Sequence, residues 1–257
     1  MLLAIDMGNT QTALGLFEGG DLVRSWSMPT DRTFTADEVH VRLVGYFHMY
    51  GLTLDDVDAI AFAGVVPQLG RTWRQVAERI AKSIIAIGPE TASVIKLKGF
   101  DPAEVGADRI ANATAAEHLY GAPSIVVDFG TATNFDVIDG SGAYIGGSIA
   151  PGLGISFDAL TARAARLASV PLKAPGHAIG GSTHEALQSG AVIGTAAMAE
   201  GMIERIKSEL GAPDATVIAT GGLAGVVAEA TDAFDVIDRE LTLKGIYEIY
   251  RRMEARG

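Results

Sequence analysis

The sequence predicts an α/β protein of two similarly built halves, each with a mixed β-sheet flanked by helices. A short hydrophobic strand that ends in Asp-x-Gly occurs twice, at Asp6 and at Asp128. Strand-like and helix-like segments alternate after an opening hairpin, a pattern typical of mixed sheets covered by helices. The 257 residues are 48% hydrophobic, which is enough to bury one large core or two moderate ones, and the repeated strand favours two.

The two repeats have the composition of anion-binding turns. The glycine two residues after each aspartate permits a turn that brings backbone N–H groups close to a bound anion. Each loop also carries hydroxyls that can donate to phosphate or ligate a cation, namely Thr10, Thr12, Thr131 and Thr133. A single Asp-x-Gly is also ordinary turn chemistry. The prediction of a nucleotide triphosphate bound with its metal ion therefore depends on both copies.

In the first half, hydrophobic alternation and turn residues predict five strands and three helices. Strands are expected at residues 2–5, 12–16, 22–28, 59–63 and 83–87, with a hairpin turn at 18–21. Thr35 and Glu38 have the spacing of a capping box, so the first helix should begin there and end before Gly51. The second helix should follow residues 64–67, and the third should begin near Asp108.

The second half repeats this plan. Strands are expected from Ser124, at residues 134–138, from Ala143 and at 216–219, with a hairpin turn at 139–142. Four helices are expected: one begins near Phe157, one spans 185–210, one follows Gly222 and one spans 241–256. Residues 163–177 should form a surface loop. We therefore predict domains at 1–121 and 122–257, and the last helix could pack back on the first domain.

Two further passages are rich in glycine. Residues 146–152 precede a predicted helix, where their glycines could serve only for close backbone packing. Thr220-Gly221-Gly222 forms a third strand-to-glycine loop, which is suited to lie against a flat adenine or ribose. Asp108 and Arg109 stand at the start of a predicted helix, where a capping aspartate with a solvated arginine would be the simplest interpretation.

Composition excludes several classes of function. The 20 basic and 31 acidic residues give a formal charge of −11, which repels nucleic acid and anionic membranes. Cysteine is absent, so disulfides, thiolate zinc sites and cysteine nucleophiles are excluded. No apolar run reaches the roughly 18 residues that a membrane span needs. We expect a soluble cytoplasmic protein with small-molecule partners.

The motifs, taken together, resemble the type III pantothenate kinase family. They are Asp6-Met7-Gly8-Asn9-Thr10, Gly106-Ala107-Asp108-Arg109, Asp128-Phe129-Gly130-Thr131-Ala132, Gly146-Gly147 with Pro151-Gly152, and Thr220-Gly221-Gly222. The resemblance covers essentially the whole chain. It implies two ribonuclease H-like domains of the actin-like ATPase, sugar kinase and Hsp70 superfamily, with ATP in the cleft between them. It also implies phosphorylation of pantothenate at its terminal hydroxyl to begin coenzyme A synthesis, in a homodimer.

The resemblance also implies the site residues. ATP would be bound by Asp6, Met7, Gly8, Asn9, Thr10, Gln11, Thr12 and Ala13, and by Thr131 and Gly221. Asp6 would lie near Mg²⁺, and Asp128 would hold a monovalent cation, potassium or ammonium. The substrate pocket would contain Gly106, Ala107, Asp108, Arg109 and Thr183, with Asp108 accepting the proton of the attacking hydroxyl and Thr183 reaching across the dimer. Arg109 would suit the carboxylate of pantothenate, because its guanidinium can form two parallel hydrogen bonds.

Three positions depart from the family pattern. Gly99, followed by Phe100, replaces a tyrosine that touches pantothenate in the family. Residues 163–168 have lost a threonine and a proline, and Ala63-Gly64 replaces a pair of serines before Val65-Val66. These changes leave two alternatives to an active pantothenate kinase. One is a non-catalytic ATP-binding paralogue that acts as a regulator, and the other is a kinase of the same fold for another small hydroxy acid.

Overall fold

The computed structural model describes residues 1–64, 67–99, 101–164, 167 and 169–256. The chain forms two compact units. The first contains Met1–Ala115 and Leu241–Gly257, and the second contains Ala116–Glu240. The boundary near residue 115 falls inside one helix, α3 (Ala107–Tyr120).

The sheet of the first unit has the strand order β3-β2-β1-β4-β5. Strands β1, β2 and β3 form an antiparallel meander, whereas β4 and β5 continue the sheet from β1 in parallel. The meander is β1 (Leu2–Met7), β2 (Gln11–Glu18) and β3 (Asp21–Pro29), followed by β4 (Ala59–Gly64) and β5 (Ser83–Ile87). The mixed sheet expected from the sequence is therefore present.

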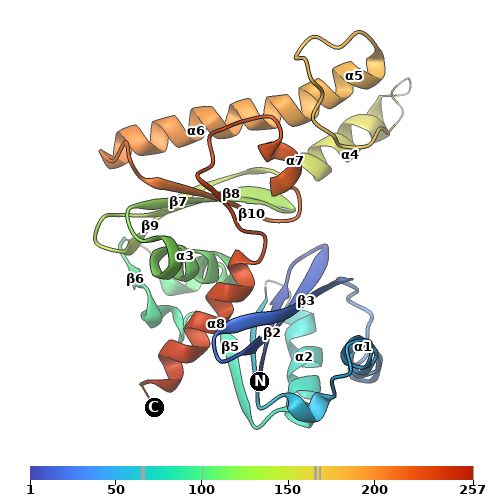
Figure 1. The fold of residues 1–257 in the computed structure, drawn as a ribbon, viewed down its shortest axis with the longest axis vertical. Helices are drawn as coiled ribbons and strands as arrows, with labels where there is room; N and C mark the ends of the chain where they lie inside the picture. The colour runs from blue at the N-terminus through green and yellow to red at the C-terminus, as the bar shows by residue number, and fades with distance from the viewer. Residues whose placement is uncertain (65–66, 100, 165–166, 168, 257) are drawn as a thin grey trace. The chain divides into compact units, whose positions relative to one another are not determined.

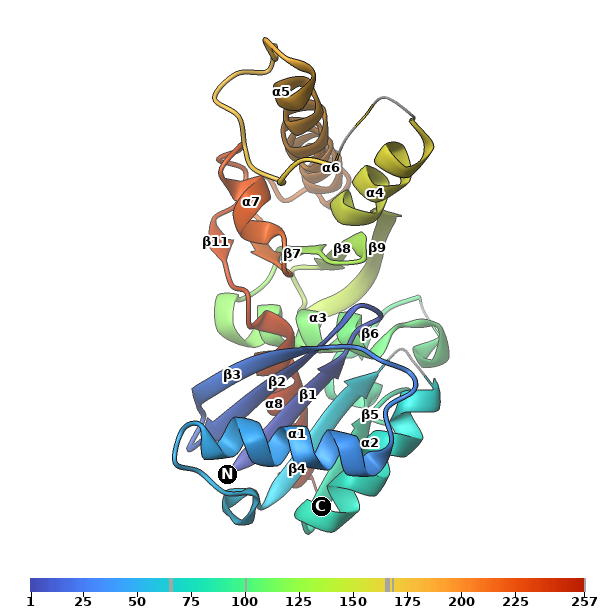
Figure 2. The ribbon, with the colours of Figure 1, turned by 90° about the vertical axis from the view of Figure 1, so that its right-hand side faces the viewer.

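Helices cover both faces of this sheet (Figure 2). On one face, α1 (Ala36–His48) and α2 (Pro67–Ile80) pack on the larger side chains of the strands, among them Ile5, Leu14 and Phe62. On the other face α8 (Leu241–Glu254) contacts β1, β2, β4 and β5. The residues of the central rows on that face are small, because Ala4 lies opposite Gly15 on one side and Ala61 on the other. Small side chains let a helix approach a sheet closely.

Helix α8 also packs tightly against α3 within the first unit. Gly245 lies so close to the backbone of Ala111 that an added Cβ would overlap the Ala111 carbonyl. One turn earlier, the Thr242 hydroxyl donates to Asn112 Oδ1 at 2.7 Å. Phe17 of β2 stacks on Tyr247 with 4.7 Å between ring centroids. These contacts fix α8 as an integral part of the first unit.

The second unit repeats the topology of the first. Its strands lie in the order β9-β8-β7-β10-β11, with β7, β8 and β9 antiparallel and β10 and β11 continuing from β7 in parallel. The strands are β7 (Ser124–Phe129), β8 (Ala132–Ile138), β9 (Ala143–Pro151), β10 (Thr216–Thr220) and β11 (Val236–Ile237). The prediction of two halves built alike is therefore confirmed in strand order and direction.

One face of the second sheet is covered by α6 (Gly194–Leu210) and α7 (Ala224–Ala228), as Figure 1 shows. The core on this face contains Val127 and Phe129 of β7, Val217 of β10 and Ile203 of α6. Helices α4 (Leu153–Arg163) and α5 (Thr183–Gln188) complete the unit. Shorter elements in the chain are β6 (Lys96–Leu97) and the single turns Leu54–Asp56, Ala92–Val94 and Pro102–Glu104.

Most predicted elements are present, with three differences. The capping box at the start of α1 is formed, because Thr35 N–H donates to Glu38 at 2.9 Å and Glu38 N–H donates back to Thr35 Oγ1 at 3.3 Å. Helix α4 begins at Leu153, earlier than predicted, since Gly152 already accepts the first helical hydrogen bond from Ser156. The predicted helix 185–210 is interrupted by a π-helical turn, Ser189–Ile193. The short strands β6 and β11 were not predicted. Residues 65–66 of the expected turn lie outside the described part.

Candidate functional site

The first Asp-x-Gly loop joins β1 to β2. Asp6 is half-buried and pairs with Ala13 on β2 and with Ala63 on β4, so all three residues lie on the face that α8 covers. Asn9, Thr10 and Gln11 are exposed at the turn, whereas Met7 is buried beside Gly64. The loop therefore presents polar groups at the end of a buried central strand.

Gly8 is required by the close approach of the two strands at this turn. A Cβ at Gly8 would lie 2.8 Å from the backbone carbonyl oxygen of Gln11, closer than real Cβ contacts occur. Gly8, two residues after Asp6, is thus explained by the packing of backbone against backbone.

The hydroxyl of Thr12 is engaged within the first unit. It is buried, 2% exposed, and its Oγ1 lies 2.9 Å from Oγ1 of Thr30. Thr30 donates its own hydroxyl proton to the Gly8 carbonyl at 2.8 Å, so Thr12 must be the donor in the pair. In this conformation the hydroxyl proton of Thr12 is donated to Thr30, and a contact of Thr12 with phosphate stays a prediction.

The second loop, between β7 and β8, holds Asp128 at the same topological position. Asp128 pairs with Asn134 on β8 and with Thr220 on β10, so three oxygen-bearing side chains lie in a row on one face of the sheet. The Thr220 hydroxyl is fully buried and has no hydrogen-bond partner within the described part of the chain. A buried unsatisfied hydroxyl beside a carboxylate is the kind of donor set that a cation can use.

Thr131 and Thr133 differ in their surroundings. Thr131 is exposed at the tip of the loop, as a ligand contact would require. Thr133 is completely buried and pairs with Phe129, whose ring belongs to the core under α6. The expectation that Thr133 donates to phosphate is therefore wrong, because its side chain lies on the opposite face from Asp128.

Two glycines enclose the Asp128 loop. Gly152 donates its N–H to the Thr131 carbonyl at 3.2 Å, and a Cβ at Gly152 would lie 2.5 Å from the Gly130 carbonyl oxygen. Gly221 has φ +91°, and a Cβ there would lie 2.5 Å from Asp128 Oδ1 and 2.7 Å from the Phe129 carbonyl. The Asp128 carboxylate therefore rests against the backbone of Gly221.

Gly221→Ala is expected to lower the free energy of unfolding by about 1–3 kcal/mol, because alanine is strained at positive φ and its methyl group would displace Asp128. Urea unfolding would measure the change. The matched control is Gly222→Ala, since an added Cβ at Gly222 meets nothing within 4 Å. This control should stay within about 0.5 kcal/mol of the parent. Equal effects of both substitutions would contradict the close contact with Asp128.

Asp108 lies in the first turn of α3 and is half-buried. Its Oδ1 accepts the N–H of Arg109 at 2.9 Å, and Gly106 lies so near Oδ1 that a side chain there would overlap it. No other hydrogen bond of this carboxylate is formed with the described residues, which leaves Oδ2 available to a ligand. The Asp108 carboxylate can therefore take this position only because residue 106 has no side chain. Ala107 is buried and begins the helix.

Thr183 begins α5 in the second unit and is exposed. Ser182 caps this helix by accepting the Glu185 N–H at 3.2 Å, and Glu185 in turn accepts the N–H of Gly181 at 2.8 Å. These reciprocal hydrogen bonds define the backbone at the start of α5, so Thr183 is held at a fixed helix terminus.

The structure accounts for one of the three departures and bears on a second. Gly99 has φ +83°, a conformation that favours glycine, so the tyrosine of the family would be strained on this backbone. Gly64 accommodates the Met7 side chain, which would overlap an added Cβ. Ala164 ends α4, whereas Phe100, Val65, Val66, Ala165, Arg166 and Ala168 lie outside the described residues.

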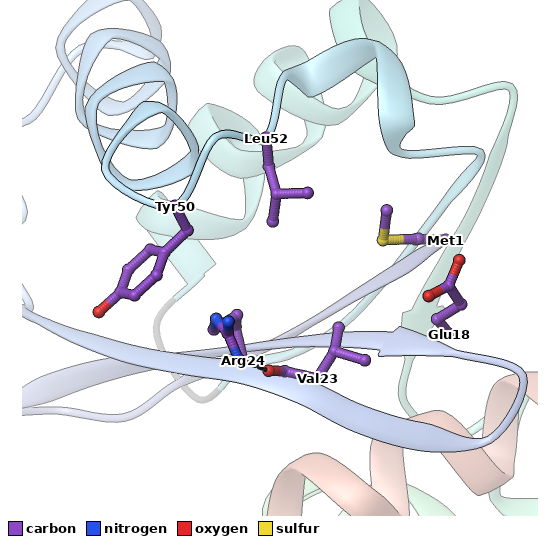
Figure 3. Close-up of a pocket in the computed structure, with 6 residues that line it drawn as sticks. All are labelled: Met1, Glu18, Val23, Arg24, Tyr50 and Leu52. Carbon is purple, nitrogen blue, oxygen red and sulfur yellow. Dashed lines mark hydrogen bonds between the residues drawn. The ribbon is translucent and has the colours of Figure 1, made fainter.

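Among the described residues, neither a cluster of metal-binding side chains nor a surface hollow identifies the site. Among the residues that the structure describes, no three His, Cys, Asp or Glu side chains come together as a metal group. Two hollows of the first unit have volumes of about 440 Å³ and 340 Å³. The larger, shown in Figure 3, is lined by Met1, Glu18, Val23, Arg24, Tyr50 and Leu52. Neither hollow includes a predicted site residue.

In the described ranges, no helix has the length and apolarity to cross a bilayer.

Sequence reasoning missed two residues that shape these loops. Thr30 contacts the first loop through both its backbone and its hydroxyl, and Thr220 lies beside Asp128. Thr220 stood in a recognised motif, but only strand pairing reveals its place next to the carboxylate. No local signal marks Thr30, because its partners Gly8 and Thr12 are 22 and 18 positions away in the chain.

Comparison with known proteins supports one family. The family model of type III pantothenate kinase matches residues 2–205. A type III pantothenate kinase of Thermomicrobium roseum is 49% identical over 255 residues, which cover 98% of each chain. That of Moorella thermoacetica is 44% identical over 253 residues, 98% of this chain and 99% of the relative.

Solved structures agree on the fold. Component A of the (R)-2-hydroxyglutaryl-CoA dehydratase of Acidaminococcus fermentans has a TM-score of 0.57 at 14% identity, and the match covers 100% of this chain and 99% of that one. At this identity the likeness concerns the fold alone. The duplicated mixed sheets confirm the predicted fold of two ribonuclease H-like domains. On these matches and motifs, the chain belongs to the type III pantothenate kinase family.

Proposed function

We propose that this protein transfers the terminal phosphoryl group of ATP to the hydroxyl of pantothenate, which yields 4'-phosphopantothenate in the first step of coenzyme A synthesis. The main support is the 49% identity to a type III pantothenate kinase over 98% of both chains. The structural observation that accords with it is the occurrence of an Asp-x-Gly loop at the same topological position in both sheets.

The ATP phosphates are assigned to the two loops. Asn9, Thr10 and Gln11 are exposed in the first loop, and Thr131 is exposed in the second. Backbone N–H groups and hydroxyls at such turns can bind phosphate oxygens. Gly221 lies beside Asp128 and has no side chain, and it is assigned to binding of the nucleoside. Further residues support the first loop in this role, namely Asp6, Met7, Gly8, Thr12 and Ala13.

The cations are assigned to the two aspartates. Asp6 is proposed to lie near Mg²⁺, which usually keeps several waters and one or two carboxylates beside the substrate phosphates. Asp128 is proposed to hold potassium or ammonium, and the unpartnered hydroxyl of Thr220 in the next strand fits such a donor set. When bound, these cations neutralise charge on the phosphates during transfer.

The substrate residues are Gly106, Ala107, Asp108, Arg109 and Thr183. Oδ1 of Asp108 is held by the Arg109 N–H, so Oδ2 can accept the proton of the attacking hydroxyl. An aspartate is a weak base, but phosphoryl transfer has a loose transition state and needs the proton removed late. The Arg109 guanidinium can bind the carboxylate of pantothenate through two parallel hydrogen bonds.

A homodimer in the cytoplasm is part of the same proposal. Six large apolar side chains among the described residues of the second unit are exposed, and one of them, Ile179, is 91% exposed. They are Leu119, Ile149, Ile155, Leu160, Ile179 and Ile237. Such side chains can form a protein interface where they adjoin one another in one patch. Thr183 would then reach the substrate of the partner subunit.

The decisive measurement is ADP formation with pantothenate, Mg-ATP and potassium, with each component omitted in turn. We expect turnover to need all of them, and Asp128→Asn to reduce turnover at saturating ATP by at least about tenfold, because it removes the charge assigned to the monovalent cation. Glu90→Gln, an exposed carboxylate with no assigned role, is the matched control.

The alternatives give different results. A non-catalytic regulator would bind ATP in calorimetry and form no ADP with any acceptor. A kinase for another hydroxy acid would form ADP with a different acid in a panel analysed by mass spectrometry, and not with pantothenate. Turnover that is indifferent to potassium would exclude the role given to Asp128.

A further inference from the structure

We propose that Thr30 is a positioning residue of the first phosphate loop, which fixes the direction in which the backbone N–H of Asn9 points. Thr30 immediately follows β3 and belongs to none of the motifs that identify the family. The inference rests on the proposed function of the loop in ATP binding, and it adds a residue that acts through the loop and does not itself touch the nucleotide.

Three hydrogen bonds join Thr30 to the loop and its supporting strand. Its backbone N–H donates to the Thr10 carbonyl at 2.9 Å, and its hydroxyl donates to the Gly8 carbonyl at 2.8 Å. The same hydroxyl accepts from Thr12 Oγ1 at 2.9 Å. A single side chain therefore completes a chain of hydrogen bonds from the buried Thr12 to the turn.

The bond to Gly8 determines the orientation of one peptide plane. Peptide groups are planar and trans, so the N–H of Asn9 points in the direction opposite to the Gly8 carbonyl. Because Thr30 holds that carbonyl, the Asn9 N–H must point away from Thr30. A backbone donor with a fixed direction binds an anion without first having to be ordered.

The second unit contains the same clamp in a reduced form. Gly152 follows the last residue of β9 as Thr30 follows the last residue of β3, and its N–H donates to the Thr131 carbonyl at 3.2 Å. In both units the second strand of the meander begins opposite the proline that ends the third strand. Gln11 pairs with Pro29 in the first unit, and Ala132 pairs with Pro151 in the second. The backbone clamp thus recurs, and only the first loop has a side chain added to it.

The segment after Thr30 is also ordered. Asp31 accepts hydrogen bonds from the hydroxyl of Thr33 at 2.6 Å and from its N–H at 2.8 Å. These bonds, the hydroxyl first, hold the pKa of Asp31 below its usual value. The turn that follows β3 is therefore held by hydrogen bonds of its own, separate from those of Thr30.

Thr30→Val tests the proposal, because valine keeps the shape and the backbone N–H but removes the hydroxyl. We expect the dissociation constant of Mg-ATP, measured by calorimetry without pantothenate, to rise about three- to tenfold, the equivalent of one hydrogen bond. KM for ATP should rise with it, whereas KM for pantothenate should stay unchanged. Thr30→Ser, which restores the hydroxyl, should recover ATP binding. Thr33→Val, which removes a nearby hydroxyl that does not contact the loop, should bind ATP as the parent does.

Two outcomes would overturn the proposal. One is ATP binding by Thr30→Val that equals the parent. The other is a variant that has lost thermal stability, affects both substrates alike and is not rescued by serine, since that pattern belongs to a merely structural residue. The proposed function fails separately, if the parent itself forms no ADP with pantothenate. The binding measurement would still decide the role of Thr30.

Discussion

Asp108→Asn is expected to lower kcat for pantothenate by about 100- to 10,000-fold, the usual contribution of a positioned general base. Asparagine has nearly the same shape and keeps an oxygen that can accept the Arg109 N–H, so the start of α3 should be unchanged. What it loses is the ability to collect the proton of the attacking hydroxyl. Because the amide can still contact the hydroxyl, KM for pantothenate should change far less than kcat.

The measurement is steady-state ADP formation over a range of pantothenate concentrations, with the mass of the product checked. Asp55→Asn is the matched control, since Asp55 is exposed in the first unit and outside the assigned site. A kcat for Asp108→Asn within about tenfold of the parent would argue against a general base at this position. Unchanged circular dichroism would exclude misfolding as the cause of a loss.

Gly245→Ala is expected to lower the free energy of unfolding by about 3 kcal/mol or more, since overpacking at a rigid backbone contact is among the costlier substitutions. The new methyl group would overlap the Ala111 carbonyl, and this contact is between two backbones, where no flexible side chain can move aside. Helix α8 would have to move from α3, and the Thr242 hydrogen bond to Asn112 would be strained with it.

Gly45→Ala is the control for this substitution. Gly45 lies inside α1 and is exposed, and a Cβ there meets nothing within 4 Å. Alanine should therefore stabilise the protein by up to about 1 kcal/mol through its higher helix propensity. Urea unfolding of the full chain would compare the two variants. Similar stability of both would show that α8 and α3 can separate at little cost.

The order and type of the main elements could be predicted from sequence because their signals are local. The alternating strands, the capping box of Thr35 and Glu38 and the repeated Asp-x-Gly all lie within a few residues of chain. The repeat also predicted that the two halves are built alike. The start of α4 was missed because its N-cap, Gly152, has no side chain to cap the helix, so the usual sequence signal of a helix start is absent.

The parts of the site that escaped prediction depend on contacts between distant residues. Thr12 reads as a phosphate donor in its motif, yet a hydrogen bond to Thr30 occupies it. Thr133 reads as the equivalent hydroxyl of the second loop, but the pleat of β8 turns it into the core beside Phe129. The sequence lists hydroxyls without showing what each one contacts or which face of a strand it occupies.

The return of α8 to the first sheet has a consequence for biosynthesis. Residues 116–240 form one uninterrupted segment, whereas the first unit needs strands made at the start of translation and a helix made after all of that segment. Until residues 241–254 leave the ribosome, the alanine-lined face of the β1 sheet stays without its covering helix. The inserted segment can therefore complete its own core first, even though the nascent chain begins with the other unit.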